Sequence, residues 1–219
     1  MICNQFKGGI GTSSRQVGPY TVGVLVQCNY GGRAGLRIAG VPVGREIPDL
    51  MPEYNRATAR EDAASAGVPS PEVHSRGGTQ SSLSNLAPID ATDALGSIIV
   101  VVATDAPFLP HQLKRLARRV PVGIGRMGGI GGNGSGDIFI AFSTANEGAW
   151  DRRVSTTIEM LPNDRMSPFF QATAEATEEA IVNAMVAGET MEGINGNRVH
   201  ALPHDRVRDI LDRYGRLDR

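Results

Sequence analysis

The sequence is poor in several features, and each shortage excludes a class of protein. Its 219 residues hold two cysteines, Cys3 and Cys28, without CxxC spacing. Neither a disulfide framework nor a zinc site is indicated, so both are expected to be reduced and structural. No apolar run approaches the roughly 18 residues that span a bilayer. The first residues also lack the apolar core of a signal peptide. We therefore expect a cytoplasmic protein that makes no membrane contact.

Charge of one sign, aromatic residues and metal-ligand patterns are also scarce. The formal net charge is -1, and aromatic residues make up 5% of the chain. Nucleic-acid binding needs a basic surface or a stacking platform, so it is not expected. His200 and His204 are four residues apart, but Pro203 lies between them, and neither His74 nor His111 completes a ligand set. We expect no metal and no cofactor.

Glycine is abundant, and its distribution indicates a loop-rich globular protein. The chain has 27 glycines, and they gather at turns between apolar runs. The length is sufficient to bury a real core in one domain, which we expect to include residues 1–219. Residues 45–94 differ, because they are polar, rich in Pro, Ser and Ala, and not periodic. We interpret them as a flexible leader to the segment that follows.

Strands are predicted where apolar residues alternate or β-branched residues run together. These patterns occur over residues 20–28, 97–104 and 138–145, with one or two further strands within 150–161. The unbroken run at 97–104 has the composition of a strand buried on both faces. The turn at 29–32 is expected to lead into an extended segment at 36–39 and to form a hairpin.

Helices are predicted where apolar residues follow a helical spacing. The pattern appears over residues 110–120, 167–186 and 203–213. Pro121 is expected to end or kink the first of these helices. The helix at 167–186 has a face of mostly small residues, which predicts close packing on a sheet.

The pair Gly96-Ser97 stands immediately before the β-branched run. If the bond between the two residues is cut, Ser97 becomes a chain terminus. Its α-amine, with a pKa of about 8, then lies next to its own hydroxyl and can act as the base. The structural alternative is that Gly96 ends a turn and Ser97 begins a strand.

Two other places carry candidate polar groups. The glycine-dense loop 128–137 lets backbone amides approach a ligand closely, and it contains Ser135 beside Asp137. This loop matches neither a calcium nonapeptide repeat nor a GxSxG elbow. Asn29 follows the strand at 20–28, where its amide can point out of the sheet edge, although asparagine is also a favoured turn residue. From the residues alone, both interpretations of Asn29 stay open.

Six blocks of sequence, in order, resemble the L-aminopeptidase/D-esterase-amidase and β-aminopeptidase family. The blocks are residues 3–15, 27–31, 96–101, 103–107, 134–139 and 141–146. The resemblance covers nearly the whole chain apart from 45–94. Members of this family are precursors that cleave themselves before a serine. The new terminal serine then releases N-terminal residues from small peptides, amides and esters.

The resemblance implies a role for each candidate residue. Gly96-Ser97 becomes the cut, which gives chains 1–96 and 97–219, and Ser97 becomes the nucleophile. Asn29 matches the asparagine whose amide stabilises the oxyanion. Ser135 and Asp137 match a serine and an acidic residue that orient the nucleophile's hydroxyl and take up its charge. A homo-oligomer of processed units is also implied.

The fold implied is α+β, a four-layer αββα sandwich also found in ornithine acetyltransferase and similar in layering to N-terminal nucleophile hydrolases. The family's precursors normally carry a substantial segment upstream of the first block, so the chain resembles the C-terminal part of a member. Two alternatives to a serine aminopeptidase remain. One is an inactive fragment or assembly subunit; the other is an acyltransferase of the ornithine acetyltransferase type, against which Ser97 argues because that family has threonine at the cut.

Overall fold

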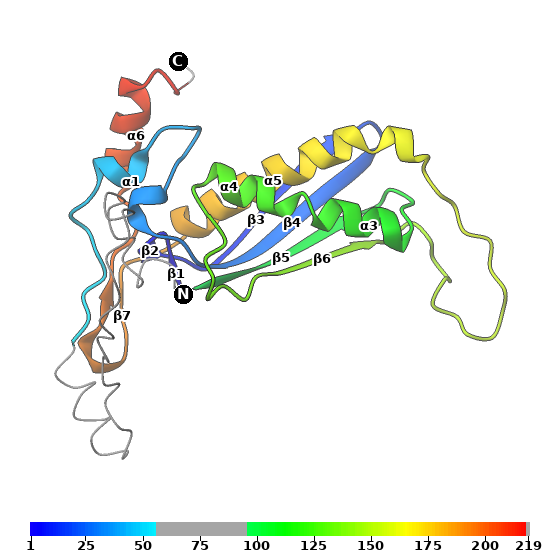
Figure 1. The fold of residues 1–219 in the computed structure, drawn as a ribbon, viewed down its shortest axis with the longest axis horizontal. Coiled ribbons are helices and arrows are strands. Elements are labelled where there is room, and N and C mark those ends of the chain that lie inside the picture. Colours follow the sequence, from blue (N-terminus) through cyan, green and yellow to red (C-terminus); the bar gives the residue numbers. More distant parts are fainter. Residues whose placement is uncertain (56–95, 218–219) are drawn as a thin grey trace, which may run out of the picture.

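A four-stranded sheet forms the centre of the computed structural model, which describes residues 1–55 and 96–217 (Figure 1). The strands lie in the order β3-β4-β5-β6, and β5 pairs antiparallel with β4 and parallel with β6. Their bounds are β3 Ile10–Val17, β4 Tyr20–Asn29, β5 Ser97–Thr104 and β6 Ile138–Ser143. The strands predicted at 20–28, 97–104 and 138–145 are confirmed. Most of the expected leader at 45–94 lies outside the described residues.

Helices cover one face of this sheet (Figure 1). They are α3 Pro110–Ala117, α4 Val120–Arg126 and α5 Ser167–Val186. The long helix α5 has its predicted bounds and packs on β3 and β4. A Cβ on Gly11 would lie 1.9 Å from the carbonyl oxygen of Ala180, so glycine on β3 and small residues on α5 allow the close packing predicted. Pro121 lies in the first turn of α4, where proline is tolerated, so it begins a second helix after α3 has ended.

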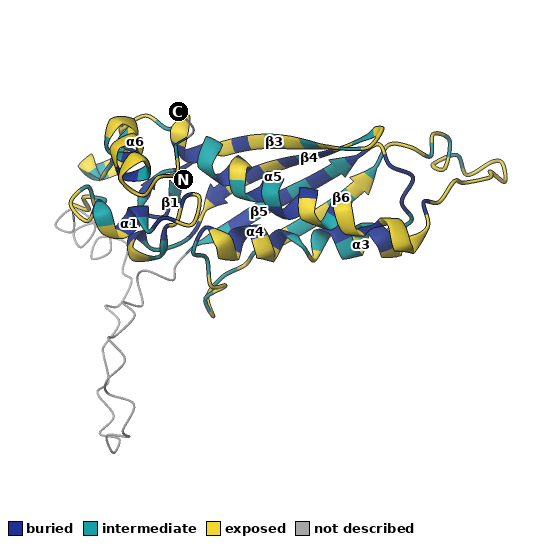
Figure 2. Cartoon of the chain, turned by 90° about the horizontal axis from the view of Figure 1, so that it is seen from above, coloured by how far each residue is buried: buried dark blue, intermediate teal, exposed yellow. Residues whose placement is uncertain are grey.

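Buried and more exposed residues alternate along the strands of the sheet (Figure 2), which is the pattern of a sheet buried on one face. Along β5, fully buried residues alternate with partly exposed ones, so the expectation of burial on both faces is wrong for the described chain. The physical reason is that α3, α4 and α5 all lie on the same side. The opposite face, here called the outer face, presents exposed apolar side chains from Ile10, Leu25, Ile138, Ile140 and Phe142.

Short elements gather at one end of the sheet (Figure 1), and this part of the chain contains a buried arginine, Arg33. These elements are β1 Ile2–Cys3, β2 Phe6–Lys7, η1 Arg33–Gly35, α1 Val43–Glu46, β7 Met191–Glu192, η4 Ile194–Gly196, β8 Arg198–Val199 and α6 His204–Arg213. The helix predicted at 203–213 is thus confirmed as α6. Arg33 is 3% exposed, and its guanidinium lies 3.3 Å from the centre of the Phe6 ring. It donates hydrogen bonds to the backbone carbonyls of Asn4, Gln5, Ile47 and Leu50.

We expect Arg33→Met to lower the free energy of unfolding by about 3 kcal/mol or more, because each buried carbonyl left without a donor costs about 1–3 kcal/mol. Burial lowers the pKa of Arg33 to about 10, so the side chain still carries its charge at neutral pH. Chemical denaturation measures the change. The control is Arg37→Met, which alters an exposed arginine in the same segment. Equal losses in the two variants would contradict this role for Arg33.

Two predicted strand features are wrong. Residues 36–39 form no hairpin with β4, because β4 already pairs with β3 on one side and β5 on the other. The chain leaves β4 through η1 and makes only an isolated bridge between Ile38 and Val41. The described residues 150–161 contain no strand. They belong to a loop that projects from the sheet, away from any strand that they could pair with (Figure 1). The Asn146 side chain closes this loop, because it donates to the Glu159 carbonyl and accepts from the Glu159 N–H.

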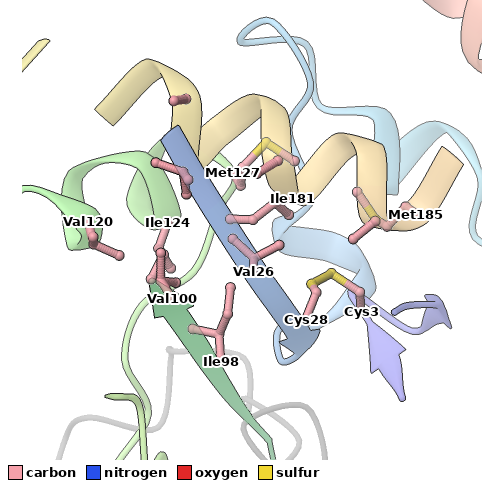
Figure 3. Close-up of a cluster of buried hydrophobic side chains, with 14 of the residues drawn as sticks. Cys3, Val26, Cys28, Ile98, Val100, Val120, Ile124, Met127, Ile181 and Met185 are labelled. Carbon is pink, nitrogen blue, oxygen red and sulfur yellow. A yellow bond between two sulfur atoms is a disulfide. The ribbon is translucent and has the colours of Figure 1, made fainter. Parts of the chain in front are cut away.

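The expectation of two reduced cysteines is also wrong, because Cys3 and Cys28 form a disulfide (Figure 3). Their Cα atoms are 5.6 Å apart, although 25 positions separate them in sequence. The hairpin of β1 and β2 folds back against the end of β4 and brings the two side chains together. Residue spacing alone does not reveal this approach.

Candidate active site

The candidate nucleophile lies at the end of the sheet where β4 finishes and β5 begins. Ser97 is the first residue of β5, and Asn29 is the last residue of β4. The two residues face each other directly in the antiparallel register. Directly opposed residues point to the same face, with their Cβ atoms about 5 Å apart. That face is the outer face of the sheet.

The loop before β6 brings the other two predicted residues to Ser97. The backbone N–H of Gly136 donates to Ser97 Oγ over 2.9 Å. Asp137 Oδ1 accepts a bond of 3.0 Å from the Ile98 N–H and one of 2.5 Å from the Ser135 hydroxyl. Parallel pairing of β5 with β6, which sets Ile99 beside Ile138, places this loop next to Ser97. The structure therefore brings all four predicted residues together.

This arrangement suits nucleophilic chemistry at Ser97. The Gly136 N–H fixes the position of Oγ, and because it occupies one lone pair of that oxygen, it restricts where the hydroxyl proton can point. The Asp137 carboxylate accepts a hydrogen bond from the Ser135 hydroxyl, which leaves the lone pairs of the Ser135 oxygen able to accept from another donor. These contacts hold a hydroxyl in place beside groups that can receive a proton.

Gly96 adopts a conformation that favours glycine. Its φ is +145°, and a Cβ there would lie 2.4 Å from the carbonyl oxygen of Asn29. The peptide bond before Ser97 therefore passes close against the end of β4, where a larger residue has no room. The candidate cut and the candidate oxyanion donor are in direct backbone proximity.

Sequence reasoning missed two contributors because both act through backbone groups, which no residue type signals. One is the Gly136 N–H on Ser97. The other is the Ile2 N–H, which donates to Asn29 Oδ1 over 2.8 Å. The buried Tyr30 was missed too. Burial raises the pKa of the Tyr30 phenol far above its usual value, and the negative charge of Asp137 adds to this, so Tyr30 stays neutral beside the site.

In the part of the chain that the structure describes, no group of three or more His, Cys, Asp or Glu side chains is placed to hold a metal ion. Over the same residues, every helix is too short or too polar to cross a membrane. The candidate site thus consists of hydroxyl, carboxyl, amide and backbone groups.

Comparison with known proteins identifies the family. The profile described as Peptidase family S58 matches residues 1–199. The chain belongs to peptidase family S58. It is 48% identical to the beta-peptidyl aminopeptidase BapA of Sphingosinicella microcystinivorans, over 99% of this chain and 50% of that protein. The resemblance inferred from the six sequence blocks is confirmed.

Solved structures of similar proteins share the fold. A Burkholderia sp. beta-aminopeptidase is 42% identical, with a TM-score of 0.70 over 98% of this chain and 52% of its own. The L-aminopeptidase D-Ala-esterase/amidase of Ochrobactrum anthropi is 41% identical, with a TM-score of 0.76 over 100% of this chain and 51% of its own. That enzyme is described as a prototype of the serine aminopeptidases and a variant of the Ntn hydrolase fold. The α+β class and this fold relationship are confirmed, and the S58 chain spans about half the length of these relatives.

Proposed function

We propose that the protein carrying this chain is a self-cleaving serine aminopeptidase and amidase. It cleaves itself between Gly96 and Ser97, and the freed Ser97 then releases small N-terminal L-, D- or β-residues from peptides, amides and esters. The observation that carries the proposal is the meeting of Ser97, Asn29, Ser135 and Asp137 at one end of the sheet, with the Gly136 N–H bonded to Ser97 Oγ. The names of the relatives support the substrate class.

Self-cleavage begins when Ser97 Oγ attacks the carbonyl carbon of Gly96. The carbon–nitrogen bond breaks, an ester forms in its place, and the serine nitrogen takes the hydroxyl proton and becomes a free amine. Water then hydrolyses the ester. The products are a carboxylate at Gly96 and an N-terminal Ser97 with its hydroxyl restored.

Turnover uses the same oxygen with a new base. The free α-amine of Ser97 takes the proton from Oγ as the oxygen attacks the substrate carbonyl, and the Asn29 amide donates to the oxyanion that develops. The tetrahedral intermediate expels the substrate's amine, which receives the proton from the Ser97 ammonium. Water hydrolyses the acyl-enzyme and releases the N-terminal residue. Ser135 and Asp137 hold the nucleophile and its charge during these steps.

The activity is tested by measuring ammonia release from L-alanine amide, D-alanine amide and β-alanine amide. We expect the processed protein to hydrolyse at least one of them and to be inactivated by a sulfonyl fluoride that labels Ser97. A processed protein that hydrolyses none of the three would contradict the proposal. Transfer of the acyl group to an added amino acid, in place of hydrolysis, would favour the acyltransferase alternative.

We expect Gly96→Ala to slow self-cleavage strongly. A Cβ at this position must displace the Asn29 carbonyl or change a φ of +145°, which costs about 1–3 kcal/mol and moves the bond that is attacked. Intact mass followed over time measures the cleavage. The control is Gly125→Ala, where a Cβ meets nothing within 4 Å. Cleavage of Gly96→Ala at the wild-type rate would be incompatible with this geometry.

Two finer expectations belong to the same proposal. The exposed apolar residues of the outer face favour a covering layer or subunit, which supports a homo-oligomer of processed units. A cytoplasmic location stays a prediction from the sequence. The Cys3–Cys28 disulfide argues against it, because disulfides persist mainly in oxidising compartments.

A further inference from the structure

We propose that the Cys3–Cys28 disulfide and the backbone N–H of Ile2 together orient the Asn29 amide, so that oxyanion stabilisation depends on the disulfide. This inference rests on the proposed function of Asn29. Cys3, Cys28 and Ile2 are positioning residues in it, because they act through Asn29 and not on the substrate.

The hairpin of β1 and β2 is attached to the last two residues of β4, Cys28 and Asn29, and to Tyr30, which follows them. Cys28 is joined to Cys3 by the disulfide (Figure 3). Asn29 Oδ1 accepts from the Ile2 N–H over 2.8 Å, and the Tyr30 carbonyl accepts from the Asn4 N–H over 2.7 Å. On the hairpin, Cys3 lies between the two donors Ile2 and Asn4, and Cys28 directly precedes the two acceptors Asn29 and Tyr30.

The bond from Ile2 decides which end of the Asn29 amide serves the site. A backbone N–H can only donate, so it selects Oδ1 and leaves Nδ2, the donor end, for another partner. Lys7 pairs with Ile2 in the hairpin, but its N–H is not a second donor to Asn29, because it donates to the carbonyl of His200. Because Asn29 stands opposite Ser97, Nδ2 is the donor available for an oxyanion there.

The disulfide is the covalent attachment between this hairpin and β4, in addition to the contacts that Arg33 makes with Phe6 and with the carbonyls of Asn4 and Gln5. Each strand of the hairpin has two residues, and a two-stranded hairpin is marginally stable even when its strands are longer. A Cβ on Gly8 would lie 2.6 Å from the Cys28 carbonyl oxygen and 2.7 Å from Cys3 Cβ. Glycine at this position therefore permits the close approach that the disulfide requires.

Reduction is expected to release this arrangement. A dithiol such as dithiothreitol transfers two electrons and two protons, which breaks the sulfur–sulfur bond, gives two cysteine thiols and leaves the dithiol as its cyclic disulfide. The Ile2 end of the hairpin is then held to β4 by hydrogen bonds alone, and the Ile2 N–H orients the Asn29 amide less firmly. We expect kcat to fall at least ten-fold while KM changes little, because an oxyanion contact acts in the transition state.

The kinetic experiment uses the processed, oxidised protein with and without dithiothreitol, followed by reoxidation. We expect kcat to fall on reduction and to recover on reoxidation. The double variant Cys3→Ala/Cys28→Ala should show the low kcat and no response to dithiothreitol. In Asn29→Ala, reduction should lower kcat no further. An equal fall on reduction in the wild type and in Asn29→Ala would overturn the proposal, since the disulfide would then act on something other than Asn29.

A second measurement does not depend on activity. Hydrogen exchange of the Ile2 amide, followed by NMR, should be slow in the oxidised protein and faster both after reduction and in Asn29→Ala. Unchanged exchange on reduction would overturn the inference even if kcat falls. If the oxidised protein releases no ammonia from any amide, the proposed function fails, and the exchange data still decide whether the disulfide positions Asn29.

Discussion

Ser97→Ala is expected to stay one uncut chain and to hydrolyse no amide. Removal of Oγ takes away the atom that attacks the Gly96 carbonyl, so neither the ester nor the free α-amine can form. Both activities should be lost together, because one oxygen starts both reactions. Intact mass measures the first, and ammonia release from alanine and β-alanine amides measures the second.

The matched control is Ser14→Ala, which removes an exposed hydroxyl from β3 of the same sheet. This variant should be cut and active like the wild type. If Ser97→Ala were still split between residues 96 and 97, another protease would be responsible. The proposal of self-cleavage would then be wrong.

Asn29→Ala is expected to lower kcat about 100- to 1000-fold, the usual cost of removing one oxyanion donor, with little change in KM. The loss should fall on kcat because the donor meets negative charge that exists only in the transition state. Steady-state kinetics on the processed protein measure both constants. A normal kcat combined with a lower melting temperature would instead support the interpretation of Asn29 as a turn residue.

Asn29→Asp separates the two ends of the same side chain. A carboxylate can still accept from the Ile2 N–H, but it offers no donor to an oxyanion. We expect this variant to lose as much kcat as Asn29→Ala while the Ile2 amide keeps its slow exchange. Full activity in Asn29→Asp would exclude the amide of Asn29 as the donor.

The elements predicted well are those with a strong local pattern. The small-residue face of α5 and the β-branched run of β5 follow from the spacing of residues within one segment, and both are found where they were expected. The family resemblance placed Ser97, Asn29, Ser135 and Asp137 in one site. The structure explains their meeting through the register of β4 with β5 and of β5 with β6.

The features that were missed depend on contacts between distant segments or on backbone groups. Cys3 and Cys28 meet because a two-residue hairpin folds against the end of β4. The one or two strands expected within 150–161 do not form, because no neighbouring strand is there to pair with them. Every residue except proline has a backbone N–H, so the sequence does not single out those of Gly136 and Ile2. Only the fold shows that the Gly136 N–H donates to Ser97 and the Ile2 N–H to Asn29.

The central claim is that Ser97 becomes a chain terminus, and identification of the N-terminal residues in the purified protein tests it most directly. Intact mass together with N-terminal sequencing should find one chain that ends at Gly96 and another that begins at Ser97 with a free α-amine. A single chain that stays continuous through residues 96 and 97, or a cut at any other bond, would contradict the account.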